Sequence, residues 1–228
     1  MKHSIALAAL LLVVQLLHAQ SDPEYRMEIG GGAGIVTYQG DYNASLLKGF
    51  QPMATAVAKY KLNPRMAWAL HLSYGMLKGK LNSGDDWFPE ETLAPESFKS
   101  SIVNTTARFE YNFWPFGTGR EYYGARKLTP FIAMGLGITF ASCKGGGSGA
   151  GLQLPVGVGV KYKVGTRWNM AVEWSMHFTS CDKLDGLKDP YGIKSSGLFK
   201  NTDSYSVLGV TLTYDIWAKC KTCNNDRD

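Results

Sequence analysis

The sequence contains one pair of cysteines whose spacing is typical of redox motifs. Cys220 and Cys223 are separated by two residues, and oxidoreductases place this spacing at a helix N-terminus within a βαβ unit. Here the pair lies in a polar C-terminal tail, and no further metal ligands follow nearby to complete a zinc site. We therefore expect these cysteines to form a disulfide, either locally or with a partner protein.

The residues that hydrolases and metalloenzymes use are not arranged in recognisable motifs. Beyond the first twenty residues the only histidines are His71 and His177. There is no Gly-x-Ser-x-Gly nucleophile elbow and no His-Glu-x-x-His zinc motif. An acidic cluster is more typical of a solvated loop than of a cation site: Asp85, Asp86, Glu90 and Glu91. The sequence therefore predicts no enzyme, no cofactor and no small-molecule substrate.

A third set of ionisable residues occurs on one face of strand-like segments: Glu28, Arg108, Glu110, Glu173 and Asp215. Residues two apart in a strand share a face, so Arg108 and Glu110 point to the same side. Isolated buried charges are costly, so a closed interior would force these groups to pair. We expect a salt-bridged plug in which Arg108 pairs with Glu110, Glu173 or Glu28. The alternative function of such a set is a proton relay or a pore.

The N-terminal residues are typical of an export signal. Lys2 precedes an apolar run over residues 5–17, and the small residue Ala19 follows, as in a secretory signal peptide. The run is short for the alternative, a membrane anchor. We expect a signal peptide in residues 1–20, a barrel in 21–217 and a periplasmic tail in 218–228. The net charge of +5 includes no run of Lys or Arg, which argues against nucleic-acid binding.

Eight segments alternate between apolar and polar residues, which is the pattern of β-strands. In residues 167–178, for example, Trp168, Met170, Val172 and Trp174 fall on one face. Segments of about ten to thirteen residues exceed typical soluble strands and suit tilted membrane-crossing strands. The segments are 25–38, 53–62, 65–77, 102–114, 128–140, 152–163, 167–178 and 205–217.

The connections alternate in length, which is typical of outer-membrane barrels with long loops outside. Two turns are tight, at 63–64 and 165–166. The connections on the other side are long: 39–52, 78–101, 141–151 and 179–204. The exception is 115–127, which is long although it falls on the short-turn side. We therefore predict an all-β, eight-stranded antiparallel transmembrane barrel in contact with outer-membrane lipids.

The aromatic residues predict two girdles, one at each membrane interface. The expected inner girdle is Tyr25, Tyr60, Trp68, Tyr111, Phe113, Tyr162, Trp168 and Tyr214, and the outer is Phe50, Tyr74, Phe140 and Phe178. A soluble lipocalin-like barrel would place the apolar face inside instead. The polar face is rich in glycine and alanine, which suits the cramped interior of eight strands. Cys143 and Cys181 fall on the outer side, where we expect a disulfide between two loops.

Two stretches resemble PorG, a small outer-membrane barrel component of the type IX secretion system. They are EIGGGAGIVTYQGD at residues 28–41, and ARFEYNFWPFG at 107–117 followed by LTPFIAMGLG at 128–137. The resemblance implies an accessory component that is neither the translocation pore nor an enzyme. It also implies partners, which are the periplasmic ring proteins of the secretion system, including a lipoprotein.

The 115–127 connection and the tail form the expected docking surface of this chain. Tyrosine and arginine often dominate interface energetics, and the candidate residues are Phe116, Arg120, Tyr122, Tyr123, Arg126, Lys127, Cys220 and Cys223. One alternative is an interfacial turn whose aromatic rings rest among lipid headgroups. The alternative function for the whole chain is an independent small barrel, such as an adhesin, a structural protein or a small-solute channel.

Overall fold

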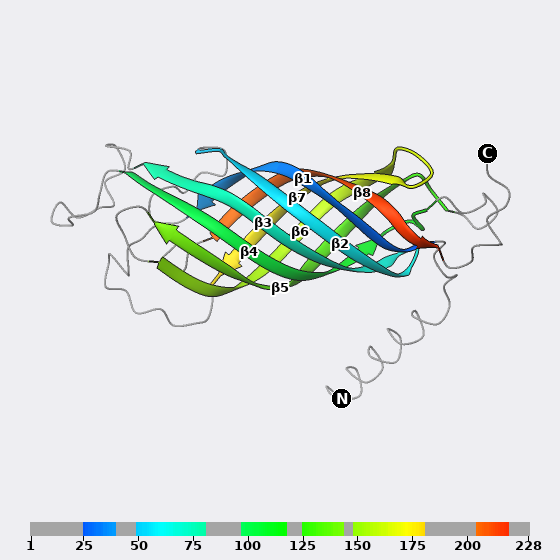
Figure 1. Cartoon of the computed structure of the whole chain (residues 1–228), viewed down its shortest axis with the longest axis horizontal. Coiled ribbons are helices and arrows are strands. Elements are labelled where there is room, and N and C mark those ends of the chain that lie inside the picture. The colour runs from blue at the N-terminus through cyan, green and yellow to red at the C-terminus, as the bar shows by residue number, and fades with distance from the viewer. Residues whose placement is uncertain are drawn as a thin grey trace, which may run out of the picture.

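The computed structural model describes residues 25–39, 49–80, 97–117, 125–143, 148–180 and 204–218. They form one closed barrel in which each strand is antiparallel to the next and β1 pairs with β8 (Figure 1). The strands are β1 Tyr25–Gln39, β2 Gln51–Asn63, β3 Met66–Lys80, β4 Ser97–Asn112, β5 Leu128–Cys143, β6 Ser148–Lys163, β7 Trp168–Thr179 and β8 Ser204–Ala218. The described residues include no helix that is long and apolar enough to cross a membrane.

The eight predicted segments are confirmed as the eight strands, in the predicted order. At the end of the barrel that carries the long connections, several strands extend further than the alternation predicted. For example, β4 begins at Ser97, because its ladder with β3 continues to the pair Lys80 and Ser97. Backbone pairing persists there although the apolar pattern has ended, since ladder hydrogen bonds do not depend on side-chain type.

The apolar face of every strand points outward. On β3, for example, Trp68, Leu70, Leu72 and Tyr74 are each more than half exposed. A soluble barrel would bury such residues, so the lipocalin-like alternative is excluded and the outer surface is a lipid-facing belt. The polar face lines the interior, as predicted.

The predicted girdles are largely present on this belt. Trp68 and Trp168 are exposed near the short turns, and Tyr74 and Phe140 are exposed near the other end. Tyr25 is the exception, because it is only 4% exposed and lies beneath the guanidinium of Arg167, 5.4 Å from its ring centre. The prediction that Tyr25 faces lipid is therefore wrong.

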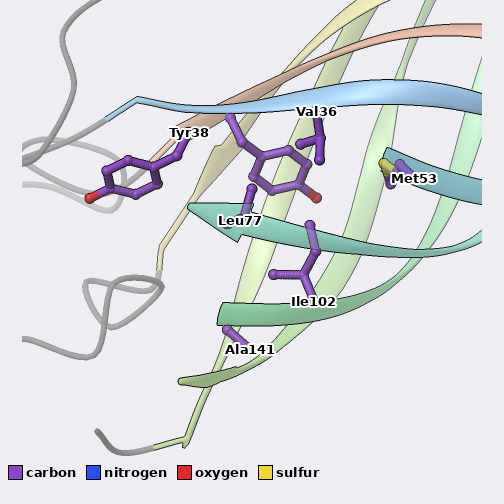
Figure 2. Packing of buried hydrophobic residues seen from close by; sticks show 7 residues of the cluster. Val36, Tyr38, Met53, Leu77, Ile102 and Ala141 are labelled. Atoms are coloured by element: carbon purple, nitrogen blue, oxygen red, sulfur yellow. The ribbon is translucent and has the colours of Figure 1, made fainter. Parts of the chain in front are cut away.

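The interior near the long connections is closed by an apolar cluster that the sequence analysis did not predict. Side chains from β1, β2, β3, β4, β5 and β8 converge there (Figure 2). The cluster consists of Val36, Tyr38, Met53, Leu77, Ile102, Ala141 and Tyr205, all nearly or completely buried. Large apolar side chains at interior positions of this end seal the lumen on the outer side.

Candidate functional site

The innermost layer of the lumen, nearest the short turns, is a cluster of two carboxylates and two lysines. Glu28 and Asp215 are directly opposite on β1 and β8, an arrangement that like charges normally destabilise. Lys61 resolves this conflict, because its Nζ lies 2.8 Å from Glu28 Oε1 and 2.7 Å from Asp215 Oδ1. Lys163 Nζ lies 2.6 Å from Asp215 Oδ2, and Asn169 donates a hydrogen bond of 2.9 Å to the same carboxylate.

The next layer is built on Glu110, whose side chain is completely buried. Lys59 Nζ lies 3.0 Å from Glu110 Oε1, and Lys161 Nζ lies 2.6 Å from Oε2. The ammonium of Lys161 also lies 4.6 Å from the centre of the Phe131 ring, a cation–π contact. Gly159 makes room for that ring, since a Cβ there would lie 2.7 Å from a Phe131 ring carbon.

The third layer joins Arg108 to Glu173 across the lumen by two parallel hydrogen bonds. Arg108 Nη1 bonds to Glu173 Oε1, and Nη2 donates to Oε2 at 3.1 Å. Arg108 Nη2 also lies 2.7 Å from His71 Nε2. Gly157 leaves room beside this bridge, because a Cβ there would lie 2.6 Å from Glu173 Oε1, the end of that side chain. Bidentate pairing fixes both side chains and satisfies most of their polar atoms.

A neutral polar layer separates the charges from the apolar cluster. Gln153 Oε1 accepts hydrogen bonds from Tyr205 Oη at 2.6 Å and Thr139 Oγ1 at 2.7 Å. Asn104 Nδ2 donates to Tyr205 Oη at 2.9 Å, and the His177 ring stacks on Tyr205 at 4.6 Å. The cavity between this layer and the Arg108 bridge measures about 50 Å³. Such a volume admits a few waters and no organic solute.

These layers make the lumen a filled interior rather than a pathway. In the part of the chain that the structure describes, every carboxylate pairs with at least one cation inside the barrel. No group of three or more His, Cys, Asp or Glu side chains in that part is arranged to hold a metal ion. The buried charges described in the interior neutralise one another.

All five residues of the predicted charge network lie in the interior, although their pairing differs in detail. Of the three partners considered for Arg108, the structure selects Glu173, whereas Glu110 and Glu28 pair with lysines. The four lysines that neutralise the network were not predicted from the sequence. The sequence nevertheless contains a signal for these lysines. Tyr60 and Tyr162 each lie between two lysines, and because the tyrosines are on the apolar face, the lysines on either side fall on the polar face. The missed residues are Lys59, Lys61, Lys161 and Lys163.

The inner mouth of the barrel is covered by Phe116. Its backbone N–H donates to Pro64 O at 3.0 Å, which folds the start of the β4–β5 connection back over the mouth. The Phe116 side chain is only 5% exposed, and its ring centre lies 5.9 Å from Lys163 Nζ. The prediction that Phe116 contacts a partner is therefore corrected, because the ring is buried against the ionic layers.

The exposed part of this inner rim is a cation on an aromatic ring. The Arg126 guanidinium lies 4.9 Å from the Trp114 ring centre, and both side chains are exposed beside the exposed Lys127. We call Trp114, Arg126 and Lys127 the inner-rim platform. A hydrogen bond of 2.7 Å from Arg126 N to Pro115 O fixes the backbone beneath it. The remaining docking candidates lie outside the described residues: Arg120, Tyr122, Tyr123, Cys220 and Cys223.

Three other predictions also fall outside the described residues. The signal peptide in residues 1–20 and the tail beyond residue 218 are not described. Cys143 ends β5, but its proposed disulfide partner Cys181 lies outside the described residues. The barrel boundaries themselves are described from Tyr25 to Ala218.

Several solved structures are similar to this barrel. Neisserial surface protein A is 14% identical over 83% of this chain and 97% of that chain, with a TM-score of 0.51. Ail of Yersinia pestis is 11% identical over 86% and 100% of the two chains, with a TM-score of 0.46. OprG of Pseudomonas aeruginosa is 13% identical over 87% and 99%, with a TM-score of 0.44. The similarity to the Neisserial protein supports the fold, and no curated protein matches this chain in sequence.

A closed barrel with a lipid-facing outer belt is an outer-membrane protein, since closure leaves no free sheet edge in the bilayer. The model of a domain of unknown function, DUF6089, matches residues 4–225, which is almost the whole chain. This outer-membrane barrel therefore belongs to the DUF6089 family.

Proposed function

We propose that this chain is a non-enzymatic accessory component of the type IX secretion system that anchors a periplasmic ring to the outer membrane. The resemblance of residues 28–41, 107–117 and 128–137 to PorG suggests this secretion system. The docking surface is the inner-rim platform together with Arg120, Tyr122, Tyr123, Cys220 and Cys223. The partner is the lipoprotein of the ring.

The closed lumen supports an anchor rather than a channel. An apolar cluster, a neutral polar layer, three ionic layers and the Phe116 ring lie in sequence along it. Eight strands leave an interior that side chains fill, so transport of even a small solute would require several layers to separate. A protein that transports nothing through its lumen acts through its surfaces.

The inner-rim platform is the observation that carries the proposal. Arg126 and Trp114 are residue types that concentrate binding energy in protein interfaces. Stacking on the indole ring holds the guanidinium in place, so a partner carboxylate would meet a preorganised donor. The four described carboxylates all lie inside the barrel and leave this platform without an internal counter-charge.

Replacing the cations of the inner-rim platform should weaken binding of the periplasmic ring proteins. We expect Arg126→Ala with Lys127→Ala to lower co-purification of the ring lipoprotein, and secretion, by at least tenfold, since a truncated hot-spot residue costs about 2 kcal/mol or more. Arg65→Ala is the matched control, because Arg65 lies in the neighbouring turn without an aromatic ring beneath it among the described residues. Heat-modifiable migration on a gel checks that each variant remains folded.

A disulfide between the tail and the partner protein can be tested separately. If Cys220 or Cys223 bonds to a partner thiol, non-reducing gels of native envelopes will contain a high-mass band that disappears in Cys220→Ser or Cys223→Ser. Normal co-purification and secretion by the platform variant, without such a band, would reject the anchor. That outcome would favour the alternative of an independent small outer-membrane barrel.

A further inference from the structure

The described charges are sorted by sign between the inside and the outside of the barrel. The carboxylates Glu28, Glu110, Glu173 and Asp215 all line the lumen. Among the described residues, the charged side chains that are exposed on the outer surface are therefore all positive. They occur at the two rims, with Arg126, Lys127 and Arg167 near the short turns and Lys78 and Lys99 at the opposite end.

Lys78 and Lys99 are direct cross-strand neighbours. They are partners in the β3–β4 register, and both side chains are exposed. Lys78 shares its face with Tyr74 and Met76, which are four and two residues away, respectively, and point outward. Opposed residues on one face have Cβ atoms about 4.5–5.5 Å apart, and like charges there are destabilising. Neither lysine has an ion pair among the described residues, so a negative group bound from elsewhere would relieve their mutual repulsion.

The height of the pair in the membrane indicates where that counter-charge comes from. Tyr74 is aligned with Val103 and Phe140 in a lipid-facing row at the outer edge of the belt. Lys78 lies four residues beyond Tyr74, about 13 Å along the strand and about 10 Å along the membrane normal at a typical tilt. The headgroup region extends about 5–8 Å beyond the hydrocarbon core, so the backbone at Lys78 lies just above it and the flexible lysine side chains can reach back to the headgroups.

We propose that Lys78 and Lys99 together bind a phosphate group of a lipid in the outer leaflet. The class of ligand is a phosphorylated glucosamine lipid, the lipid A part of lipopolysaccharide, whose acyl chains would lie along the apolar faces of β3 and β4. A phosphate monoester carries close to two negative charges and several acceptor oxygens, which matches two adjacent ammonium groups. This site is on the opposite rim from the inner-rim platform and does not depend on the proposed secretion role.

The test measures binding of hexa-acylated lipid A bisphosphate to the refolded full-length protein in detergent by native mass spectrometry. Each cation near a charged membrane surface contributes about fivefold in affinity, so Lys78→Gln with Lys99→Gln should weaken binding about 25-fold. Dephosphorylated lipid A should bind wild type as weakly as the intact lipid binds this variant. The charge-matched control, Arg26→Gln with Arg65→Gln near the other rim, should bind lipid A like wild type.

A second variant separates the site from a folding defect. Lys99→Glu should form an ion pair with Lys78, so the lipid-free barrel should be at least as stable as wild type while its affinity for lipid A falls. Unchanged affinity in either lysine variant, or an equal loss in the control, would overturn the proposal. Inorganic phosphate that competes at the same concentration as lipid A would overturn the assignment to a lipid.

Discussion

Glu110→Gln should destabilise the barrel by about 3–5 kcal/mol, because it leaves two buried lysines without their carboxylate. The Glu110 side chain is fully buried, and both Lys59 and Lys161 contact it within 3.0 Å. The amide keeps the size of the side chain and removes its charge, so the loss measures ion pairing rather than a cavity. Urea unfolding of the protein in lipid vesicles, followed by tryptophan fluorescence, gives the free energy of unfolding.

The control for the Glu110→Gln variant also removes the two lysines that this substitution leaves without a carboxylate. Adding Lys59→Met and Lys161→Met to Glu110→Gln replaces the charged cluster with groups of similar volume. Such replacement is commonly neutral or stabilising, so most of the lost stability should return. A single variant that unfolds at the same urea concentration as wild type would show that Glu110 does not hold the inner layers together.

The second large effect is expected at Arg108. Arg108→Met removes both hydrogen bonds to Glu173 and the contact with His71, and it leaves the Glu173 carboxylate uncompensated in the lumen. Breaking one side of a buried pair costs about 3–5 kcal/mol. Adding Glu173→Gln should recover a large part of this loss, and the double-mutant cycle isolates the pair energy. Equal and additive losses for the two single variants would mean that the bridge contributes nothing.

The fold could be predicted from the sequence because its two signals are local. Alternation in residues 167–178 sets which side chains face lipid, and the lengths of the connections set which end faces outward. The partners inside the barrel could not be predicted in the same way. Lys59, on β2, meets Glu110 on β4, and Arg108 on β4 meets Glu173 on β7. These contacts join strands that are not neighbours, so they depend on barrel tilt and stagger, which alternation does not specify.

The arrangement of side chains at the turns and rims also could not be predicted from local sequence patterns. Phe116 resembles an exposed interface residue in the sequence, yet one backbone hydrogen bond to Pro64 folds it over the barrel mouth. Tyr25 fits the aromatic girdle by position, yet the Arg167 side chain from the β6–β7 turn covers it. The apolar cluster around Val36 and Ile102 was missed because its members come from separate strands that meet only in the closed barrel.

The closed lumen is the feature that distinguishes an anchor from a channel. Conductance across planar lipid bilayers that contain the purified, refolded protein tests it most directly. We predict no steady single-channel current at moderate voltage, since the ionic layers built on Glu110, Arg108 and Asp215 fill the interior. Large, stable and reproducible current steps from the folded protein would contradict the plug and, with it, the assignment of this barrel as an anchor.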